Sequence, residues 1–173
     1  MKIRKTIGKD ASKILEYCKV IGSETDNLTF GSGGIPITVQ AEEKYLNELA
    51  ESLRNIYLIA EEDDEIVGSA VCASYEKKRL AHRATISISV KRKYWGKHIG
   101  TKLMEEIMKF VRNTPTIKII SLEVRSDNSI AIHLYEKFGF KKIGTFKGYM
   151  CIDNNYVDCD IMELVLDENE ASK

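Results

Sequence analysis

The sequence predicts an α/β fold in which a mixed sheet carries helices on both of its faces. Residues 85–90 alternate β-branched and small side chains with the period of a strand, and apolar side chains recur at helical spacing from residue 99. Pairs of strand-like segments around turn residues lie at 56–75 and 141–166. A middle region that alternates strand and helix, flanked by hairpins, is typical of such a sheet.

The N-terminal part predicts one strand followed by two helices. Residues 2–7 alternate polar and apolar side chains, as a strand does. Asp10 is expected to cap a helix that ends near Gly22, and Thr38 a second helix that continues to about Arg54. The apolar face of the first helix comprises Ala11, Ile14, Leu15 and Cys18. The apolar face of the second comprises Ala41, Tyr45, Leu46, Leu49 and Leu53.

The remaining strands and helices follow from the same two periodicities. Strands are expected at 56–60, 66–75, 85–90, 117–124, 141–151 and 156–166. The acidic run 61–65 marks the turn of the first hairpin, and residues 153–155 mark the turn of the last. One helix is expected from Ile99, and a shorter one at 128–137 is closed by Gly139.

Length and composition limit the class of protein. With 173 residues and 43% hydrophobic content, the chain is expected to form a single domain, residues 1–173. Its 26 basic residues balance 26 acidic ones, which argues against a nucleic-acid partner. No apolar run has the length of a signal peptide or a membrane span, so no membrane partner is expected.

The four cysteines, Cys18, Cys72, Cys151 and Cys159, have no metal-ligand spacing and form no Cys-x-x-Cys pair. Neither a metal site nor a thiol redox role is therefore expected. They are interpreted as reduced, buried thiols of a cytoplasmic protein. A disulfide that joins Cys151 and Cys159 across the last hairpin is the alternative.

Residues 91–101 connect a strand to the N-terminus of a helix, where N–H groups lack intrahelical partners and the helix dipole is positive. Such a loop is suited to phosphate. Gly96 and Gly100 allow a ligand to approach the backbone, and the surrounding basic residues are Lys91, Arg92, Lys93 and Lys97. An ordinary strand-to-helix turn is the alternative. Neither Gly-x-Gly-x-x-Gly nor Gly-Lys-[Ser/Thr] is present, which argues against dinucleotide redox chemistry and nucleotide hydrolysis.

Two blocks of the sequence together resemble the GCN5-related N-acetyltransferase (GNAT) superfamily, and the resemblance extends from Ile3 to Leu166. The pattern Asn-x-x-Ala-x-x-Leu-Tyr-x-x-x-Gly-Phe is complete, with Asn128, Ala131, Leu134, Tyr135, Gly139 and Phe140. The other block resembles the acetyl-CoA pyrophosphate loop, [Gln/Arg]-x-x-Gly-x-[Gly/Ala], and ends on Gly100. In that loop Trp95 stands where Gln or Arg is usual, and His98 where the family generally has glycine.

The resemblance implies the GNAT fold, with a mixed, mostly antiparallel seven-stranded sheet and a V-shaped splay between its two central parallel strands. It also implies acetyl-CoA as cosubstrate, with the pantetheine arm paired to the backbone of the first of these strands. The residues that it assigns to acetyl-CoA are Ile88, Ser89, Val90, Gly96, Lys97, His98, Ile99, Gly100, Thr101, Asn128 and Tyr135.

Direct acetyl transfer to an amine requires an uncharged nucleophile and a proton for the departing thiolate. Tyr135 is the expected acid, because a phenol keeps its proton at neutral pH. A hydroxyl satisfied by the backbone is the alternative. Glu123 is the expected base, since its position resembles that used by acetyltransferases of ribosomal-protein N-termini, and partial burial would raise its pKa. A structural role is its alternative, and His133 is expected on the exposed side of its helix.

Residues 24–36 are rich in turn residues and long for a passive connection. One interpretation is a flexible surface loop. The other follows from the resemblance, because GNAT enzymes typically place their acceptor-binding loop between the first two helices. Leu28 and Phe30 would then supply apolar contact, while Glu24 and Asp26 would attract a cationic amine.

The sequence therefore predicts an acetyl-CoA-dependent N-acetyltransferase of a primary amine, which could be a small amine, a polyamine or a peptide N-terminus. The resemblance is closest to bacterial enzymes of these kinds. A non-catalytic acyl-CoA-binding sensor and an enzyme that uses another acyl-CoA are the alternatives. A homodimer is expected through the C-terminal hairpin, whose apolar residues are Ile143, Phe146, Tyr149 and Met150.

Overall fold

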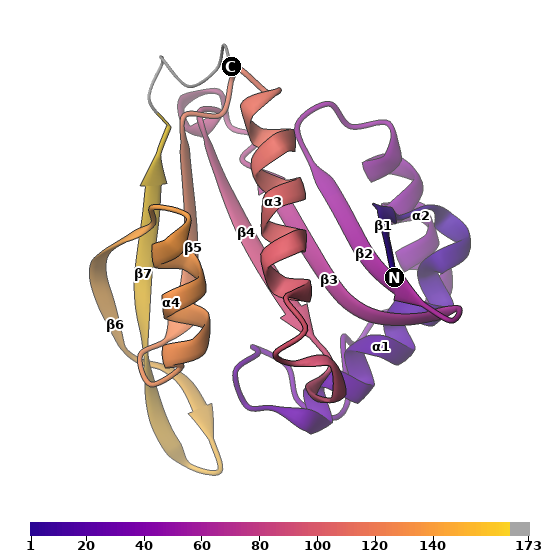
Figure 1. Cartoon of the computed structure of the whole chain (residues 1–173), viewed down its shortest axis with the longest axis horizontal. Helices are drawn as coiled ribbons and strands as arrows, with labels where there is room; N and C mark the ends of the chain where they lie inside the picture. Colours follow the sequence, from indigo (N-terminus) through magenta and orange to yellow (C-terminus); the bar gives the residue numbers. More distant parts are fainter. Residues whose placement is uncertain (167–173) are drawn as a thin grey trace. The chain divides into compact units, whose positions relative to one another are not determined.

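The computed structural model describes residues 1–166, whose strands form one mixed sheet in the order β1-β2-β3-β4-β5-β7-β6 (Figure 1). The strands are β1 (Lys2–Lys5), β2 (Ile56–Glu62), β3 (Glu65–Ser74), β4 (Arg83–Val90), β5 (Ile119–Arg125), β6 (Lys141–Ile152) and β7 (Asn155–Val165). The helices are α1 (Ala11–Glu24), α2 (Val39–Ala50), α3 (Ile99–Arg112) and α4 (Ser129–Lys137), with short 3-10 helices η1 (Gly8–Asp10), η2 (Lys78–Leu80) and η3 (Arg92–Tyr94). β4 and β5 are the parallel pair, so the predicted seven-stranded mixed sheet is confirmed.

The contacts within the chain divide it into two compact units. The first comprises Met1–Ala73 with Ser87–Thr114, and the second comprises Ser74–Ile86 with the chain from Pro115. The boundary crosses β4, so that its first half belongs to the second unit and its second half to the first. The prediction of a single domain, residues 1–173, and the predicted splay of the central strands stay predictions.

In the first unit, helices cover both faces of the sheet. α3 lies on one face of β2 and β3, while α1 and α2 lie on the other (Figure 1). Glycine at position 68 of β3 allows α3 to approach, because a Cβ there would lie 3.1 Å from side-chain atoms of Ile99 and of Leu103. The core on the opposite face consists of Ala11, Ile14, Tyr17, Cys18, Ile21, Leu46, Leu49, Tyr57, Ile59 and Ile66. The predicted helices on both faces are thus present in this unit.

The buried face of α2 differs from the prediction. Thr38 caps the helix as expected, since its Oγ1 accepts a hydrogen bond from the Ala41 N–H at 3.2 Å, but the helix ends at Ala50. The side chains that the fold buries are those of Glu42, Leu46 and Leu49, whereas the expected Ala41, Tyr45 and Leu53 are exposed. Burial raises the pKa of the Glu42 carboxyl. The packing against α1 and β2 therefore selects a face that includes a carboxylate, which hydrophobic periodicity does not predict.

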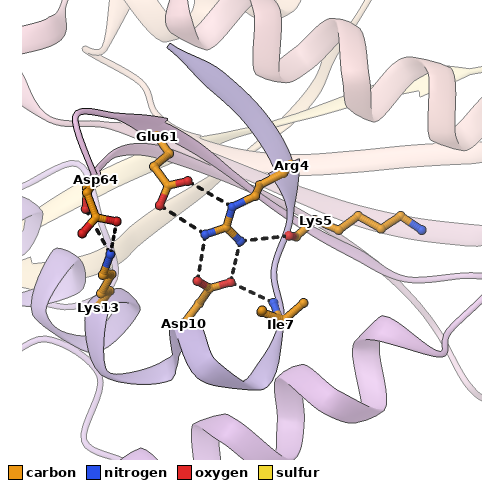
Figure 2. Close-up of polar contacts among 7 residues, drawn as sticks. All are labelled: Arg4, Lys5, Ile7, Asp10, Lys13, Glu61 and Asp64. Atoms are coloured by element: carbon orange, nitrogen blue, oxygen red, sulfur yellow. Dashed lines mark hydrogen bonds and ion pairs between the residues drawn. The ribbon is translucent and has the colours of Figure 1, made fainter.

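Asp10 precedes α1 as predicted, but its side chain does not cap that helix. Its two carboxylate oxygens instead accept hydrogen bonds from the Arg4 guanidinium at 2.7 and 2.9 Å, and Oδ2 also accepts the Ile7 N–H at 2.9 Å (Figure 2). The same guanidinium donates to both oxygens of Glu61 on β2, at 3.1 and 3.2 Å. Arg4 thus ties β1 to the start of α1 and to β2 through two carboxylates.

In the second unit, α4 packs on one face of β5 and β7 (Figure 1). The register pairs Leu122 with Met162 and Val124 with Asp160, so these four side chains share a face of the antiparallel ladder. The parallel β4–β5 pairs extend from Arg83↔Ile119 to Thr85↔Ser121. An ion pair between Arg83 and Glu163 joins β4 to β7 on the other side of β5.

The cysteines within residues 1–166 are all free, but they are not all buried. Cys18, Cys72 and Cys159 are buried as expected, whereas Cys151 is exposed, so that prediction is wrong for Cys151. Cys151 pairs with Tyr156 next to the turn of the last hairpin, on the strand at the edge of the sheet order, where less of the fold covers it. Cys159 pairs with Phe146, so the two cysteines are not cross-strand partners.

None of the helices in residues 1–166 combines the length and the apolar character that crossing a membrane would require.

Candidate functional site

The loop that was expected to hold phosphate has the backbone of a tight strand-to-helix connection. β4 ends at Val90, η3 follows, and α3 begins at Ile99. Gly96 has φ +75° and His98 has φ +59°, both in the left-handed region. That conformation costs a non-glycine residue about 1 kcal/mol, which explains why a glycine is usual in the family at the position of His98. His98 thus adopts a left-handed conformation although it is not a glycine.

The N-terminus of α3 is favourable to an anion. Its first turn contains no acidic residue, and the side chain of His98 makes no capping hydrogen bond. The Nζ atoms of Lys93 and Lys97 lie 5.4 and 4.6 Å from the centroid of the Tyr94 ring. The charge of Lys91 is instead balanced by an ion pair, because its Nζ lies 2.6 Å from Glu65 Oε1. Exposed N–H groups, a positive helix end and nearby ammonium groups are together suited to bind a phosphate.

The last residues of β4 are fixed by contacts on the α1 side of the sheet. Ser89 Oγ lies 2.9 Å from the Tyr17 hydroxyl and 3.0 Å from Ser69 Oγ. Burial raises the pKa of Tyr17, so its phenol is uncharged at neutral pH. Tyr17 was not among the predicted residues, although its position between Ile14 and Ile21 on the apolar face of α1 indicates burial.

The segment between α1 and α2 contacts the rest of the first unit through three of the residues named above, Glu24, Leu28 and Phe30. Glu24 is the last residue of α1, and its Oε2 accepts the N–H of Arg92 at 2.8 Å. Its carboxylate therefore holds the start of η3, instead of lying in the loop where it was expected to attract an amine. Leu28 and Phe30 pack against the core of the first unit, so the apolar contact that they provide is to that core.

In the second unit, α4 carries the signature residues in a well-defined arrangement. Asn128 is the N-cap of α4, and its Oδ1 accepts the Ala131 N–H at 3.2 Å, which shows a structural use of the side chain that was assigned to the cofactor. Gly139 ends the segment with φ +91°. These two positions explain part of the signature by helix geometry alone.

Tyr135 is the buried side chain of α4, 6% exposed, with its ring centroid 5.9 Å from that of Phe140. Burial raises its pKa to about 12, so the phenol is protonated throughout the neutral range. Its hydroxyl makes no hydrogen bond to another of residues 1–166, which removes the alternative of a hydroxyl satisfied by the backbone. A protonated hydroxyl on a largely buried side chain, without a hydrogen-bond partner among the described residues, is suited to act as an acid.

Glu123 lies on β5 between two buried residues, Leu122 and Val124, and is itself exposed. The expected partial burial is therefore wrong. Successive side chains of a strand point to opposite faces, so Glu123 lies on the face opposite to Leu122 and Val124. Tyr149 lies near Glu123, since the pKa of Tyr149 is raised by its burial and further by the Glu123 charge. His133 is exposed on α4, as expected.

The expected site residues thus fall into two groups. The first unit brings together Ile88, Ser89 and Val90 at the end of β4 and the loop Gly96, Lys97, His98, Ile99, Gly100 and Thr101. The second unit holds Glu123 on β5 and Asn128 and Tyr135 at α4. The first group is suited to bind a phosphorylated carrier through backbone amides, and the second supplies a carboxylate and a protonated phenol.

A mixed sheet with a parallel central pair, a helix N-terminus suited to phosphate and a protonated phenol are the features expected of transferases that use an acyl group carried on coenzyme A. Residues 30–140 match the model of the Acetyltransferase (GNAT) family, and this chain belongs to that family. It is an N-acetyltransferase that takes the acetyl group from acetyl-CoA and transfers it to an amine.

Sequence relatives include the L-amino acid N-acetyltransferase AaaT of Escherichia coli, which is 32% identical over 62% of this chain and 67% of its own. An N-alpha-acetyltransferase of Saccharolobus solfataricus is 47% identical over 37% of this chain and 38% of its own. The N-alpha-acetyltransferase RimI of Mycobacterium tuberculosis is 32% identical over 59% of this chain and 61% of its own.

Solved structures show the same fold. An acetyltransferase of the GNAT family from Streptococcus pneumoniae superposes with a TM-score of 0.91 at 26% identity, over 96% of this chain and 99% of that one. The putative acetyltransferase yncA of Salmonella typhimurium, solved with its cofactor acetyl-CoA, has a TM-score of 0.83 at 20% identity, over 97% of this chain and 95% of that one.

Proposed function

We propose that the acceptor is an α-amino group, either of a free L-amino acid or of a peptide N-terminus. The observation that carries this choice is the exposed position of Glu123 on β5. The α-amine of a peptide has a pKa near 8 and is neutral in roughly one molecule of ten at pH 7, whereas a lysine-like amine is neutral in about one of a few thousand. A carboxylate in water is a sufficient base for the first but not for the second.

The names of the relatives support the same acceptor class. AaaT of E. coli is named for L-amino acids, and the enzymes of S. solfataricus and M. tuberculosis are named for the N-alpha position. All three names describe α-amines. The matched segments cover between 38% and 67% of these relatives, so the acceptor of this chain is a proposal on its own evidence.

In the proposed reaction, each proton has a defined origin and destination. The ammonium of the acceptor loses a proton to Glu123 through water, and the neutral nitrogen attacks the thioester carbonyl. The C–N bond forms, the C–S bond breaks, and Tyr135 gives its proton to the departing thiolate, while the second proton released by the acceptor nitrogen returns through water to the Tyr135 phenolate. The loop Gly96–Thr101 binds the pyrophosphate, while the backbone of Ile88–Val90 pairs with the pantetheine amides.

The experiment that tests this function is thiol release from saturating acetyl-CoA in the presence of one amine at a time. The panel contains free L-amino acids, peptides with varied N-termini, spermidine and an aminoglycoside. Amino acids or peptides should accelerate release, and N-terminally blocked peptides that keep their lysines should not. Acceleration by spermidine or the aminoglycoside alone would overturn the α-amine proposal. Tight binding of acetyl-CoA without any acceleration would instead favour a non-catalytic sensor.

Glu123→Gln is expected to lower kcat/KM for a peptide acceptor about tenfold at pH 7, because the neutral fraction of a peptide α-amine is about one tenth. The acidic limb of the pH profile of kcat/KM in this variant should then reflect only the pKa of the acceptor amine. The matched control is Glu136→Gln, an exposed carboxylate on α4 of the same unit, which should leave the profile unchanged. An acidic limb in Glu123→Gln identical to that of the wild type would exclude Glu123 as the base.

We also propose a homodimer through the face of β6, the last strand in the sheet order. Ile143, Phe146 and Tyr149 are 57%, 44% and 43% exposed, and the rings of Phe146 and Tyr149 stack with centroids 5.3 Å apart. Met150, the fourth expected residue, is half-buried. Sedimentation velocity should show a dimer for the wild type and a monomer for Phe146→Ser. A wild type that stays monomeric at high concentration would contradict the dimer.

The proposed location is the cytoplasm, because free thiols at Cys18, Cys72 and Cys159 are typical of a reducing compartment. The proposed partners are acetyl-CoA and the amine, without nucleic acid or membrane. Fractionation of cells that express the chain would test the location.

A further inference from the structure

The side chain of Trp95 folds back over η3 onto the end of β4. Its indole Nε1–H donates a hydrogen bond to the carbonyl oxygen of Val90 at 2.7 Å. Its own backbone N–H donates to the Arg92 carbonyl oxygen at 3.1 Å, which closes the 3-10 turn between them. Trp95 therefore makes a side-chain hydrogen bond to the strand on one side of the turn and precedes Gly96 on the other.

Two further contacts hold this turn from outside. The Arg92 guanidinium lies 5.5 Å from the centroid of the Trp95 ring, within the range of a cation–π interaction. The backbone N–H of Arg92 donates to Glu24 Oε2 at the end of α1, at 2.8 Å. All four residues, Glu24, Val90, Arg92 and Trp95, belong to the first unit. The indole is thus itself held in place, so its N–H ties the turn to the end of β4.

The segment that follows has few contacts of its own. Gly96 has φ +75°, and a Cβ there would find no atom within 4 Å. The N–H of Lys97 reaches the Tyr94 carbonyl oxygen only at 3.4 Å. A loop that binds phosphate through backbone amides gains affinity when those amides are held in place before the ligand arrives. The hydrogen bond from Trp95 is placed to supply that restraint at the N-terminal side of the loop.

We propose that Trp95 is a positioning residue for acetyl-CoA, which holds the loop Gly96–Thr101 in its binding conformation through the indole N–H. Gln or Arg, usual in the family at this position, also carry side-chain N–H donors, and the indole has a donor and no acceptor. Trp95 therefore keeps a side-chain N–H donor at this position, although it replaces the usual Gln or Arg. This inference rests on the proposed role of the loop in binding the pyrophosphate.

The test compares acetyl-CoA with S-acetylpantetheine, a donor that lacks the pyrophosphate. Trp95→Phe keeps a ring and removes the donor, so KM for acetyl-CoA should rise about three- to tenfold, the range for loss of one hydrogen bond, with kcat unchanged. The kcat/KM for S-acetylpantetheine should stay the same. Trp95→Gln, which restores a donor, should recover at least half of the loss. Amide hydrogen exchange in residues 96–101 should be faster in Trp95→Phe than in the wild type without ligand.

Two results would overturn the inference. Equal KM for acetyl-CoA in Trp95→Phe and the wild type would show that the hydrogen bond does not position the loop. An equal loss with both donors would show that Trp95 acts through the fold or another part of the site. Failure of the proposed function can be told apart by measuring the binding of acetyl-CoA to the wild type. Trp95 is the only tryptophan of the chain, so a change in its fluorescence reports binding at the loop. If neither that fluorescence nor calorimetry detects acetyl-CoA, the function and this inference fall together.

Discussion

Tyr135→Phe is expected to lower kcat about 100-fold while the Kd for acetyl-CoA changes less than twofold. The substitution keeps the ring that packs on Phe140 and removes only the hydroxyl, whose pKa is raised by burial to about 12. A positioned acid typically accelerates a reaction 10²- to 10⁴-fold, and the expected loss is at the lower end of this range. Thiol release measures kcat, and calorimetry measures Kd.

The matched control is Tyr156→Phe, because this phenol is 80% exposed and belongs to the same unit. Its turnover should equal that of the wild type. Equal turnover in Tyr135→Phe would remove the phenol from the mechanism, whereas a parallel loss of acetyl-CoA binding would make it a binding residue.

Arg4→Met should lower the free energy of unfolding by about 3 kcal/mol at pH 7, measured by urea denaturation. The substitution keeps much of the aliphatic stem and leaves two carboxylates without their cation (Figure 2). The side chains of Asp10 and Glu61 are 7% and 19% exposed, so water replaces the lost hydrogen bonds poorly. Lys44→Met is the control, since Lys44 and its partner Glu48 are 79% and 66% exposed and such a pair contributes little.

The pH dependence of this effect has a definite sign. The Arg4 hydrogen bonds lower the pKa of Asp10 below its usual value, in spite of the burial that opposes them. A carboxyl with a lowered pKa stabilises the fold above its unfolded value, near 3.9, and that contribution is lost as the pH falls through the folded value. The difference between wild type and Arg4→Met should therefore shrink below about pH 4. A difference no larger than that of Lys44→Met at pH 7 would contradict the structural role of Arg4.

Local sequence patterns were sufficient to predict most of the strands and helices. The hairpin β2–β3 and the hairpin β6–β7 both follow from strand periodicity on either side of turn residues, and each turn has two non-glycine residues at positive φ, which are Asp63, Asp64, Asp153 and Asn154. Asn and Asp tolerate that conformation better than most residues. The position of α3 was predictable for the same kind of reason, since its apolar residues keep a helical period over the whole element.

The predictions that failed concern contacts between distant segments. The Asp10 carboxylate, expected to cap α1, accepts hydrogen bonds from Arg4 instead. The second helix buries Glu42, whereas Tyr45 and Leu53, which were expected to be buried, are exposed. Neither outcome has a local signal, because the competing partner lies on another element. Glu123 is exposed although its neighbours Leu122 and Val124 are buried, and the alternation of the strand alone does not say which face the fold covers.

The sequence by itself determined the order of the elements, the two hairpins, the phosphate-suited loop and the tyrosine of the complete signature. These properties depend on periodicity and on residue spacing within one segment. The tertiary structure alone decided which carboxylates are buried, which cation Asp10 binds, and that the Trp95 indole donates to Val90. Such contacts join residues whose approach is set by the packing of helices on the sheet, and no local pattern encodes that approach.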